Sequence, residues 1–155
     1  LVPQLEVVTD HDALFAAMRR DDFDPSQVVL TDRPQAVSMT QPPQGDLGTA
    51  VVTKREATRV VIEVEAASPC VLVLADAYYP GWKVMIDDRP SRIFPAYHVF
   101  RGVLIPEGSY TVEFVYLPLS LSIGLLISTA ALLAGCYAGF RVLQELKREA
   151  RGTGV

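Results

Sequence analysis

The residues most able to do chemistry in this sequence are consecutive: Tyr78-Tyr79-Pro80-Gly81-Trp82. Exposed aromatic rings stack on the faces of sugars, so Tyr78, Tyr79 and Trp82 are candidate glycan-binding residues. Large aromatic side chains also dominate core energetics, and we favour the interpretation in which Trp82 and one tyrosine pack inside the domain. Pro80-Gly81 suits the central positions of a type II turn, where glycine adopts a positive φ.

Four carboxylates could supply the acid pair of a glycosidase: Asp76, Asp87, Asp88 and Glu113. Nothing in their spacing selects two of them, and Asp87-Asp88 is better explained as a hairpin turn. We interpret His98 as a surface histidine rather than a general base. The sequence has no nucleophile elbow, phosphate-binding glycine loop or Ser-His-Asp order. We therefore assign no catalytic residue and expect no cofactor.

The histidines and cysteines predict neither a metal site nor a disulfide. His11 and His98 are far apart in the sequence, and neither has a Cys or His at ligand spacing. Cys136 falls inside an apolar helix and Cys70 in the domain before it, too far apart for disulfide geometry. Cys70, beside apolar residues, is expected to be a small buried side chain.

The elements that position these residues predict a mixed fold. Residues 1–32 resemble a small β-α-β unit, and residues 33–48, with three prolines and two glycines, form a linker. Residues 49–117 carry six or seven short strand signals, which predict an antiparallel β-sandwich of the immunoglobulin-like type. Arg59–Glu65 alternates between two faces, whereas Val71–Ala75 is continuously apolar, as a central strand would be.

The C-terminal part of the chain predicts one transmembrane helix, residues 118–141. No charged residue occurs from Phe114 to Phe140, and Leu119–Phe140 is predominantly apolar. At 1.5 Å per residue this stretch spans roughly 33 Å, enough to cross a hydrocarbon core of about 30 Å. Pro118 suits the first turn of the helix, so the sandwich would lie close to the lipid headgroups, and membrane lipid is an expected partner.

Charge predicts the orientation of that helix. Its C-terminal side carries four basic residues: Arg141, Lys147, Arg148 and Arg151. The positive-inside rule places the tail, residues 142–155, in the cytoplasm, and residues 1–117 outside it, in the periplasm or extracellular space. The chain's net charge is −4, of which residues 141–155 contribute +2, so residues 1–140 carry −6. Such an acidic domain is a poor candidate for binding nucleic acid.

Small residues recur along the predicted membrane helix at spacings of three and four: Gly124, Ser128, Ala131, Gly135 and Gly139. Small side chains let helix backbones approach closely, and contact then drives association in lipid. Membrane helices are also generally rich in Gly and Ala. We predict that this face packs against other membrane helices, which would lie upstream in the same protein.

The first residues, Leu1–Val8, resemble a strand and not a signal for insertion. We expect this chain to be the C-terminal part of a longer protein whose earlier segments insert into the membrane. A cleaved signal peptide is the alternative.

Several short motifs within residues 60–128 form a specific set. They are LADAYYPGWKV at 74–84, Ile86-Asp87, FRGV at 100–103, PEG at 106–108 and YTVEFVY at 110–116. Together they resemble the C-terminal region of the YfhO-type bacterial membrane proteins. This family is similar to GT-C glycosyltransferases, large polytopic proteins that use a lipid-linked sugar at the outer membrane face. The resemblance implies that the catalytic carboxylates lie upstream, so none is carried over to this chain.

Three functions remain open. The domain could be an accessory unit of a glycosyltransferase-like protein, positioning or gating a glycan or lipid-linked sugar. It could be a sugar-binding module in its own right, with Tyr78, Tyr79 and Trp82 as its stacking platform. It could also be a structural or partner-docking domain that never contacts substrate.

Overall fold

The computed structural model of the chain describes residues 1–33 and 45–152. It comprises two compact units, Leu1–Leu117 and Pro118–Val155. Most of the predicted linker, residues 34–44, lies outside the described residues. The secondary structure of the first unit consists, in order, of β1 (Gln4–Val7), α1 (His11–Met18), β2 (Val28–Thr31), β3 (Gly48–Arg55), β4 (Arg59–Ala66), β5 (Cys70–Ala77), β6 (Trp82–Ile86), β7 (Arg89–Ser91), β8 (Ile93–Ala96), β9 (Phe100–Ile105) and β10 (Gly108–Tyr116).

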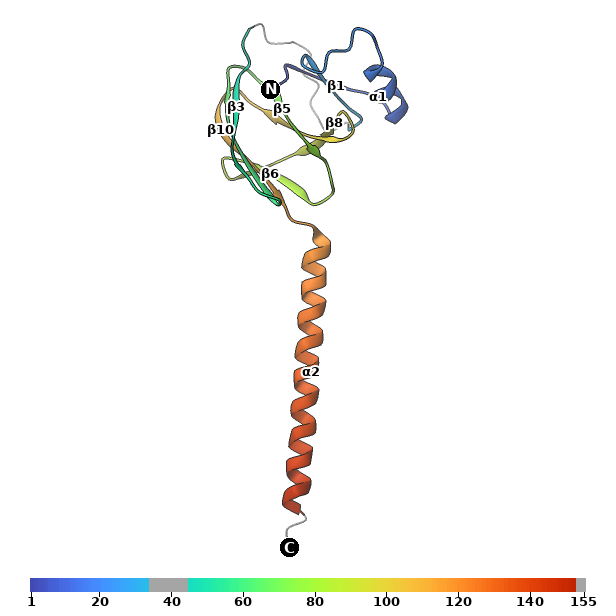
Figure 1. Ribbon diagram of the computed structural model, residues 1–155, viewed down its shortest axis with the longest axis vertical. Helices are drawn as coiled ribbons and strands as arrows, with labels where there is room; N and C mark the ends of the chain where they lie inside the picture. The colour runs from blue at the N-terminus through green and yellow to red at the C-terminus, as the bar shows by residue number, and fades with distance from the viewer. Residues whose placement is uncertain (34–44, 153–155) are drawn as a thin grey trace. The chain divides into compact units, whose positions relative to one another are not determined.

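Two antiparallel sheets make up most of the first unit (Figure 1). One has five strands in the order β3-β4-β10-β6-β7, and the other has three in the order β5-β9-β8. A single buried cluster joins them, drawn from β4, β6 and β10 on one side and from β5 and β9 on the other. The predicted antiparallel β-sandwich is therefore confirmed.

The three-stranded sheet is buried on both faces, which explains the continuous apolar run in β5. Cys70, Leu72 and Leu74 belong to the cluster between the two sheets. The alternate residue Val71 belongs to a second cluster, on the opposite face. A strand covered on one side only would alternate apolar and polar residues, whereas this one needs apolar residues throughout. Cys70 is buried and unpaired, as expected.

The N-terminal residues supply the cover for that second face. Strands β1 and β2 pair in parallel around α1, so the predicted β-α-β unit is confirmed. Leu14 of α1 and Val29 of β2 are fully buried in the second cluster with Phe94 of β8. Val2 also exchanges two backbone hydrogen bonds of 2.8 Å with Val71. Residues 1–32 thus pack onto the three-stranded sheet.

Two kinds of turn place residues at the ends of the strands. Gly81 has a φ of 111°, and the Trp82 amide donates to the Tyr79 carbonyl at 3.3 Å, as a type II turn requires. Asp87 and Asp88 both have positive φ, 46° and 62°, and form a two-residue hairpin loop between β6 and β7. The Asp87 carboxylate accepts a hydrogen bond from the Thr111 amide at 2.9 Å, which stabilises this turn.

A glycine is required at position 102 of β9 because the Phe94 ring packs closely against it, and not because of its backbone conformation. It pairs with Phe94 across the β8–β9 ladder, and a Cβ added at Gly102 would lie 2.6 Å from the Phe94 ring. Phe94 is 4 % exposed, so its ring has little room to move.

We predict that Gly102→Val lowers the free energy of unfolding of the first unit by about 2 kcal/mol, because it overpacks this site. Urea denaturation followed by the fluorescence of Trp82, the single tryptophan of the chain, measures the loss. Thr49→Val, at an exposed position of β3, is the control and should change little. Equal stabilities of the two variants would contradict the packing role of Gly102.

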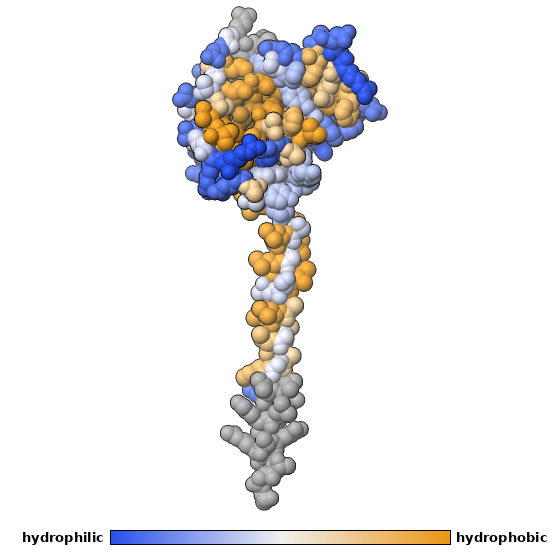
Figure 2. Space-filling model, in the orientation of Figure 1, coloured by the Kyte–Doolittle hydropathy of each residue, from blue (hydrophilic) through white to orange (hydrophobic). Residues whose placement is uncertain are grey.

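The second unit contains one helix, α2 (Leu119–Gly152). Residues 119–141 are long and apolar enough to cross a membrane. Figure 2 shows apolar side chains on its first part. The helix continues past Arg141, so the predicted tail begins as helix.

Candidate ligand pocket

The aromatic turn after β5 lies at the edge of a pocket in the first unit. Tyr79 is 61 % exposed and Trp82 is half-buried, and both line the pocket. Tyr78 is half-buried and does not line it; its amide donates to the Val99 carbonyl at 2.7 Å. Of the three predicted glycan-stacking residues, the structure therefore brings two to one cavity.

The cavity has a volume of about 320 Å³. This is near the lower end of the range for small-molecule sites, about 300–1,000 Å³. Its walls come from the β3–β4 loop, the end of β5, the aromatic turn and β9: Arg55, Glu56, Ala57, Val60, Asp76, Ala77, Tyr79, Trp82 and Arg101. It thus combines exposed aromatic surface with several charged groups.

Arg101 is the most unusual residue of the pocket. It is 4 % exposed, and its guanidinium carbon lies 3.7 Å from the centre of the Trp82 ring, in a cation–π contact. Burial lowers the pKa of the Arg101 guanidinium, and the neighbouring charge of Asp76 opposes that shift. Only Nη2 has a charged partner, while the buried Nε and Nη1 have no hydrogen-bond partner among residues 1–33 and 45–152. Unpaired buried donors are costly, and the contact with the Trp82 ring offsets part of that cost.

A carboxylate is held between two guanidinium groups at the same wall. Asp76 Oδ2 lies 3.2 Å from Arg101 Nη2, and Asp76 Oδ1 lies 2.7 Å from Arg55 Nη2. Asp76 occupies an irregularity of the β5–β9 ladder, where the register shifts between Leu74 and Ala77. Such bulges re-aim a side chain that regular pairing would direct elsewhere.

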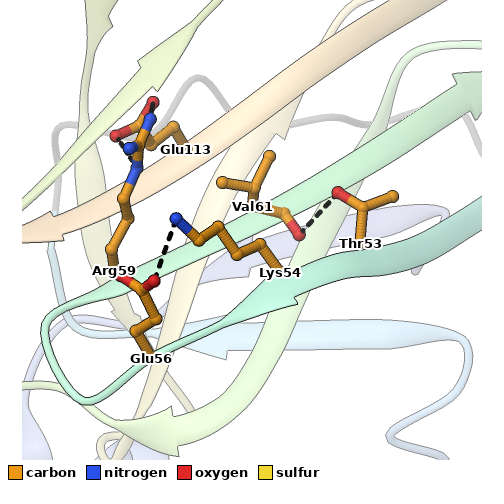
Figure 3. Close-up of polar contacts among 6 residues, drawn as sticks. All are labelled: Thr53, Lys54, Glu56, Arg59, Val61 and Glu113. Atoms are coloured by element: carbon orange, nitrogen blue, oxygen red, sulfur yellow. Dashed lines mark hydrogen bonds and ion pairs between the residues drawn. The ribbon is translucent and has the colours of Figure 1, made fainter.

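Two ion pairs involve residues of the β3–β4 hairpin, one within the hairpin and one joining it to β10 (Figure 3). Lys54 Nζ lies 2.9 Å from Glu56 Oε1. Arg59 contacts both carboxylate oxygens of Glu113, with Nε–Oε1 at 2.7 Å and Nη2–Oε2 at 3.0 Å. Glu113, which we considered as one member of an acid pair, is thus an ion-pair partner on β10.

The two arginines that line this pocket were not predicted from the sequence. We did not select Arg55 or Arg101, although Arg101 lies within the apolar run of β9, where an isolated charge is unusual. The signal was present in the sequence, but its partner Asp76 could not be identified without the strand register.

A comparison with protein-family models matched residues 44–128 to the family described as "Bacterial membrane protein YfhO". The match covers more than half of the chain and includes the pocket's lining residues. This chain belongs to the YfhO family. Comparisons with curated proteins and with solved structures gave no significant match.

Membership of the YfhO family agrees with the apolar helix, and the chain is a membrane protein. The small residues predicted to pack against other helices lie on α2 and are exposed in this chain. A Cβ built on Gly124, Gly135 or Gly139 meets nothing within 4 Å. Their packing against further helices stays a prediction.

Proposed function

We propose that residues 1–117 of this YfhO-family chain form an extracytoplasmic accessory domain that binds the sugar part of a glycan or lipid-linked sugar. In this proposal the domain positions or gates that substrate for a larger polytopic protein resembling GT-C glycosyltransferases. The observation that carries the proposal is Arg101, a buried cation that contacts the Trp82 ring at the wall of a cavity that Tyr79 also lines.

The chemistry of the pocket fits a single sugar unit. Tyr79 offers an exposed ring against which a sugar face can stack. Arg55 and Asp76 supply hydrogen-bond donors and acceptors for hydroxyl groups, and Arg101 adds positive charge at the wall. Arginine donors also bind phosphate strongly, so a sugar phosphate should be preferred over the neutral sugar.

The chain's connectivity supports action near the membrane surface. Only Leu117 and Pro118 separate the end of β10 from the start of α2. With the basic tail in the cytoplasm, this short connection would keep the domain beside the outer headgroups, where lipid-linked sugars are presented. The small residues of α2 would hold the helix against upstream helices of the same protein.

We predict saturable binding of glucose 1-phosphate to the full chain in detergent micelles, with a Kd of about 1 mM or lower and weaker binding of glucose. Because Trp82 is the single tryptophan and lines the pocket, its fluorescence reports occupancy directly. Tyr79→Ala should weaken binding roughly tenfold, which corresponds to about 1.4 kcal/mol.

Tyr137→Ala is the matched control, because Tyr137 is 63 % exposed, like Tyr79, but lies on α2. It should leave the Kd unchanged. Glucuronic acid tests whether a carboxylate can replace the phosphate. No saturable change with any of the three probes, or equal affinities for Tyr79→Ala and the unmodified chain, would reject sugar binding and favour a structural or partner-docking domain.

A further inference from the structure

The only two histidines of the chain meet on the surface of the first unit. His11 is the first residue of α1, and His98 lies in the loop between β8 and β9. Their ring centroids are 4.1 Å apart and the rings are nearly perpendicular. This contact was not indicated by the spacing of the two histidines in the sequence.

Local structure fixes both histidines. Asp10 caps α1 by accepting a hydrogen bond from the Ala13 amide at 2.8 Å, which sets the first turn and therefore His11. Tyr97 donates its hydroxyl to the Pro25 carbonyl at 2.6 Å, and its amide donates to Leu30 at 2.8 Å.

The backbone of the β8–β9 loop is unusual at the same point. Tyr97 and His98 have φ values of 49° and 69°, a conformation that non-glycine residues adopt infrequently. Such conformations are costly and tend to persist where the surrounding contacts impose them. Here the hydrogen bonds of Tyr97 to the N-terminal residues impose the conformation that places His98 beside His11.

Asp32, directly after β2, completes a group of three potential ligands. The ligand atoms of His11, Asp32 and His98 all lie within 4.8 Å of one another. Asp32 Oδ1 is buried and has no hydrogen-bond partner in the part of the chain that the structure describes; Arg33 Nε lies 3.8 Å away. Ligands about 2.0–2.1 Å from a tetrahedral Zn²⁺ are roughly 3.4 Å apart, so small side-chain rotations suffice to close the group around an ion.

We propose that His11, Asp32 and His98 bind a divalent transition metal, Zn²⁺ in the first place. Two imidazoles and one carboxylate suit Zn²⁺, and three protein ligands leave a fourth position for water. The ligands come from α1, the end of β2 and the β8–β9 loop, so the ion joins the N-terminal β-α-β unit to the three-stranded sheet. Phe15 covers one side, with its ring 4.8 Å from that of His11. The site does not involve the Arg101 pocket and does not depend on sugar binding.

The test uses the full chain in micelles, purified without a polyhistidine tag. Because the chain has two histidines, an NMR spectrum of labelled imidazoles shows two sets of ring signals. Adding Zn²⁺ to one equivalent should shift both sets together. Competition against a chromophoric chelator then gives the Kd, and Zn²⁺ should raise the thermal midpoint of the first unit.

Three variants each remove one ligand: His11→Ala, Asp32→Asn and His98→Asn. Asparagine is chosen at His98 because it tolerates the left-handed backbone. Each variant should weaken Zn²⁺ binding by roughly 100-fold or more, because even second-shell changes cost 10–100-fold. Asp22→Asn removes an exposed acid from the turn after α1 and should leave the Kd unchanged.

Either of two results would overturn the proposal. The first is that only one histidine, or neither, shifts with one equivalent of Zn²⁺. The second is that Asp32→Asn binds Zn²⁺ as tightly as Asp22→Asn. The histidines would then be an aromatic cluster with Phe15, a packing contact and nothing more.

Discussion

Asp76→Ala is expected to lower the free energy of unfolding of the first unit by about 3 kcal/mol. The substitution leaves the Arg101 guanidinium, which is 4 % exposed, without its carboxylate. Removing one partner of a buried ion pair typically costs about 3–5 kcal/mol, because the other charge stays buried and unpaired. We expect the lower end, since Asp76 itself is 25 % exposed and the Trp82 ring still contacts the guanidinium.

A double substitution tests this cause. Adding Arg101→Met to Asp76→Ala removes the unpaired charge and replaces the arginine with an unbranched, flexible apolar side chain. An apolar replacement of a buried pair is often neutral or stabilising, so the double variant should recover most of the lost stability. Urea denaturation of the full chain in micelles, followed by Trp82 fluorescence and by circular dichroism, measures the free energy of unfolding. It is applied to the unmodified chain, to Asp76→Ala and to the double variant.

Glu56→Ala is the matched control. It also removes a carboxylate that lines the pocket and forms an ion pair, but Glu56 is 51 % exposed. Exposed pairs contribute about 0–1 kcal/mol. If Asp76→Ala cost no more than Glu56→Ala, or if the double variant were less stable than Asp76→Ala, the account of Arg101 as a buried, paired cation would be wrong.

The features predicted correctly from the sequence are those set by neighbouring residues. The apolar run after Pro118 predicts a helix that could span a membrane, because its length and composition are sufficient to cross the hydrocarbon core. Alternation in β4 predicts one buried face, and Val60, Ile62 and Val64 are indeed buried. The turn at Gly81 follows from glycine's tolerance of positive φ.

The features that sequence reasoning missed depend on contacts between distant segments. Asp76 meets Arg101 only because β5 pairs with β9 and the ladder is irregular beside Asp76. His11 meets His98 only because the β-α-β unit packs against the sheet that contains β8. Neither the pairing of strands that are far apart in the sequence nor the docking of a helix leaves a local pattern, so residue spacing could not reveal these groups.

The Asp87-Asp88 turn illustrates an intermediate case. Two consecutive residues with positive φ are usually Asn-Gly or Asp-Gly. Here the second residue is also aspartate, with a φ of 62°. The sequence predicted the hairpin, whereas the left-handed conformation of both residues became evident only from the structure, where strand pairing and the Asp87–Thr111 hydrogen bond hold it.

Phe114→Ala should be the most destabilising substitution in the sandwich, with an expected loss of about 4 kcal/mol. Phe114 is fully buried and is the largest of the completely buried side chains. It lies in β10, the central strand of its sheet, between Val60 of β4 and Val84 of β6. Truncating a buried phenylalanine removes transfer free energy and leaves a cavity, which together cost about 3–5 kcal/mol.

The same substitution should also disturb the pocket, because the Arg101 guanidinium carbon lies 5.8 Å from the Phe114 ring. Phe114→Ala should therefore shift the emission of Trp82 in the folded protein as well as lower the urea midpoint. Val115→Ala, at the next residue of the same strand, truncates a half-buried side chain and should cost below about 1 kcal/mol. If Phe114→Ala were as stable as Val115→Ala, the two sheets would not share the buried core described above. The packing of Phe114 against Arg101 could then not explain why Arg101 lies beside Trp82.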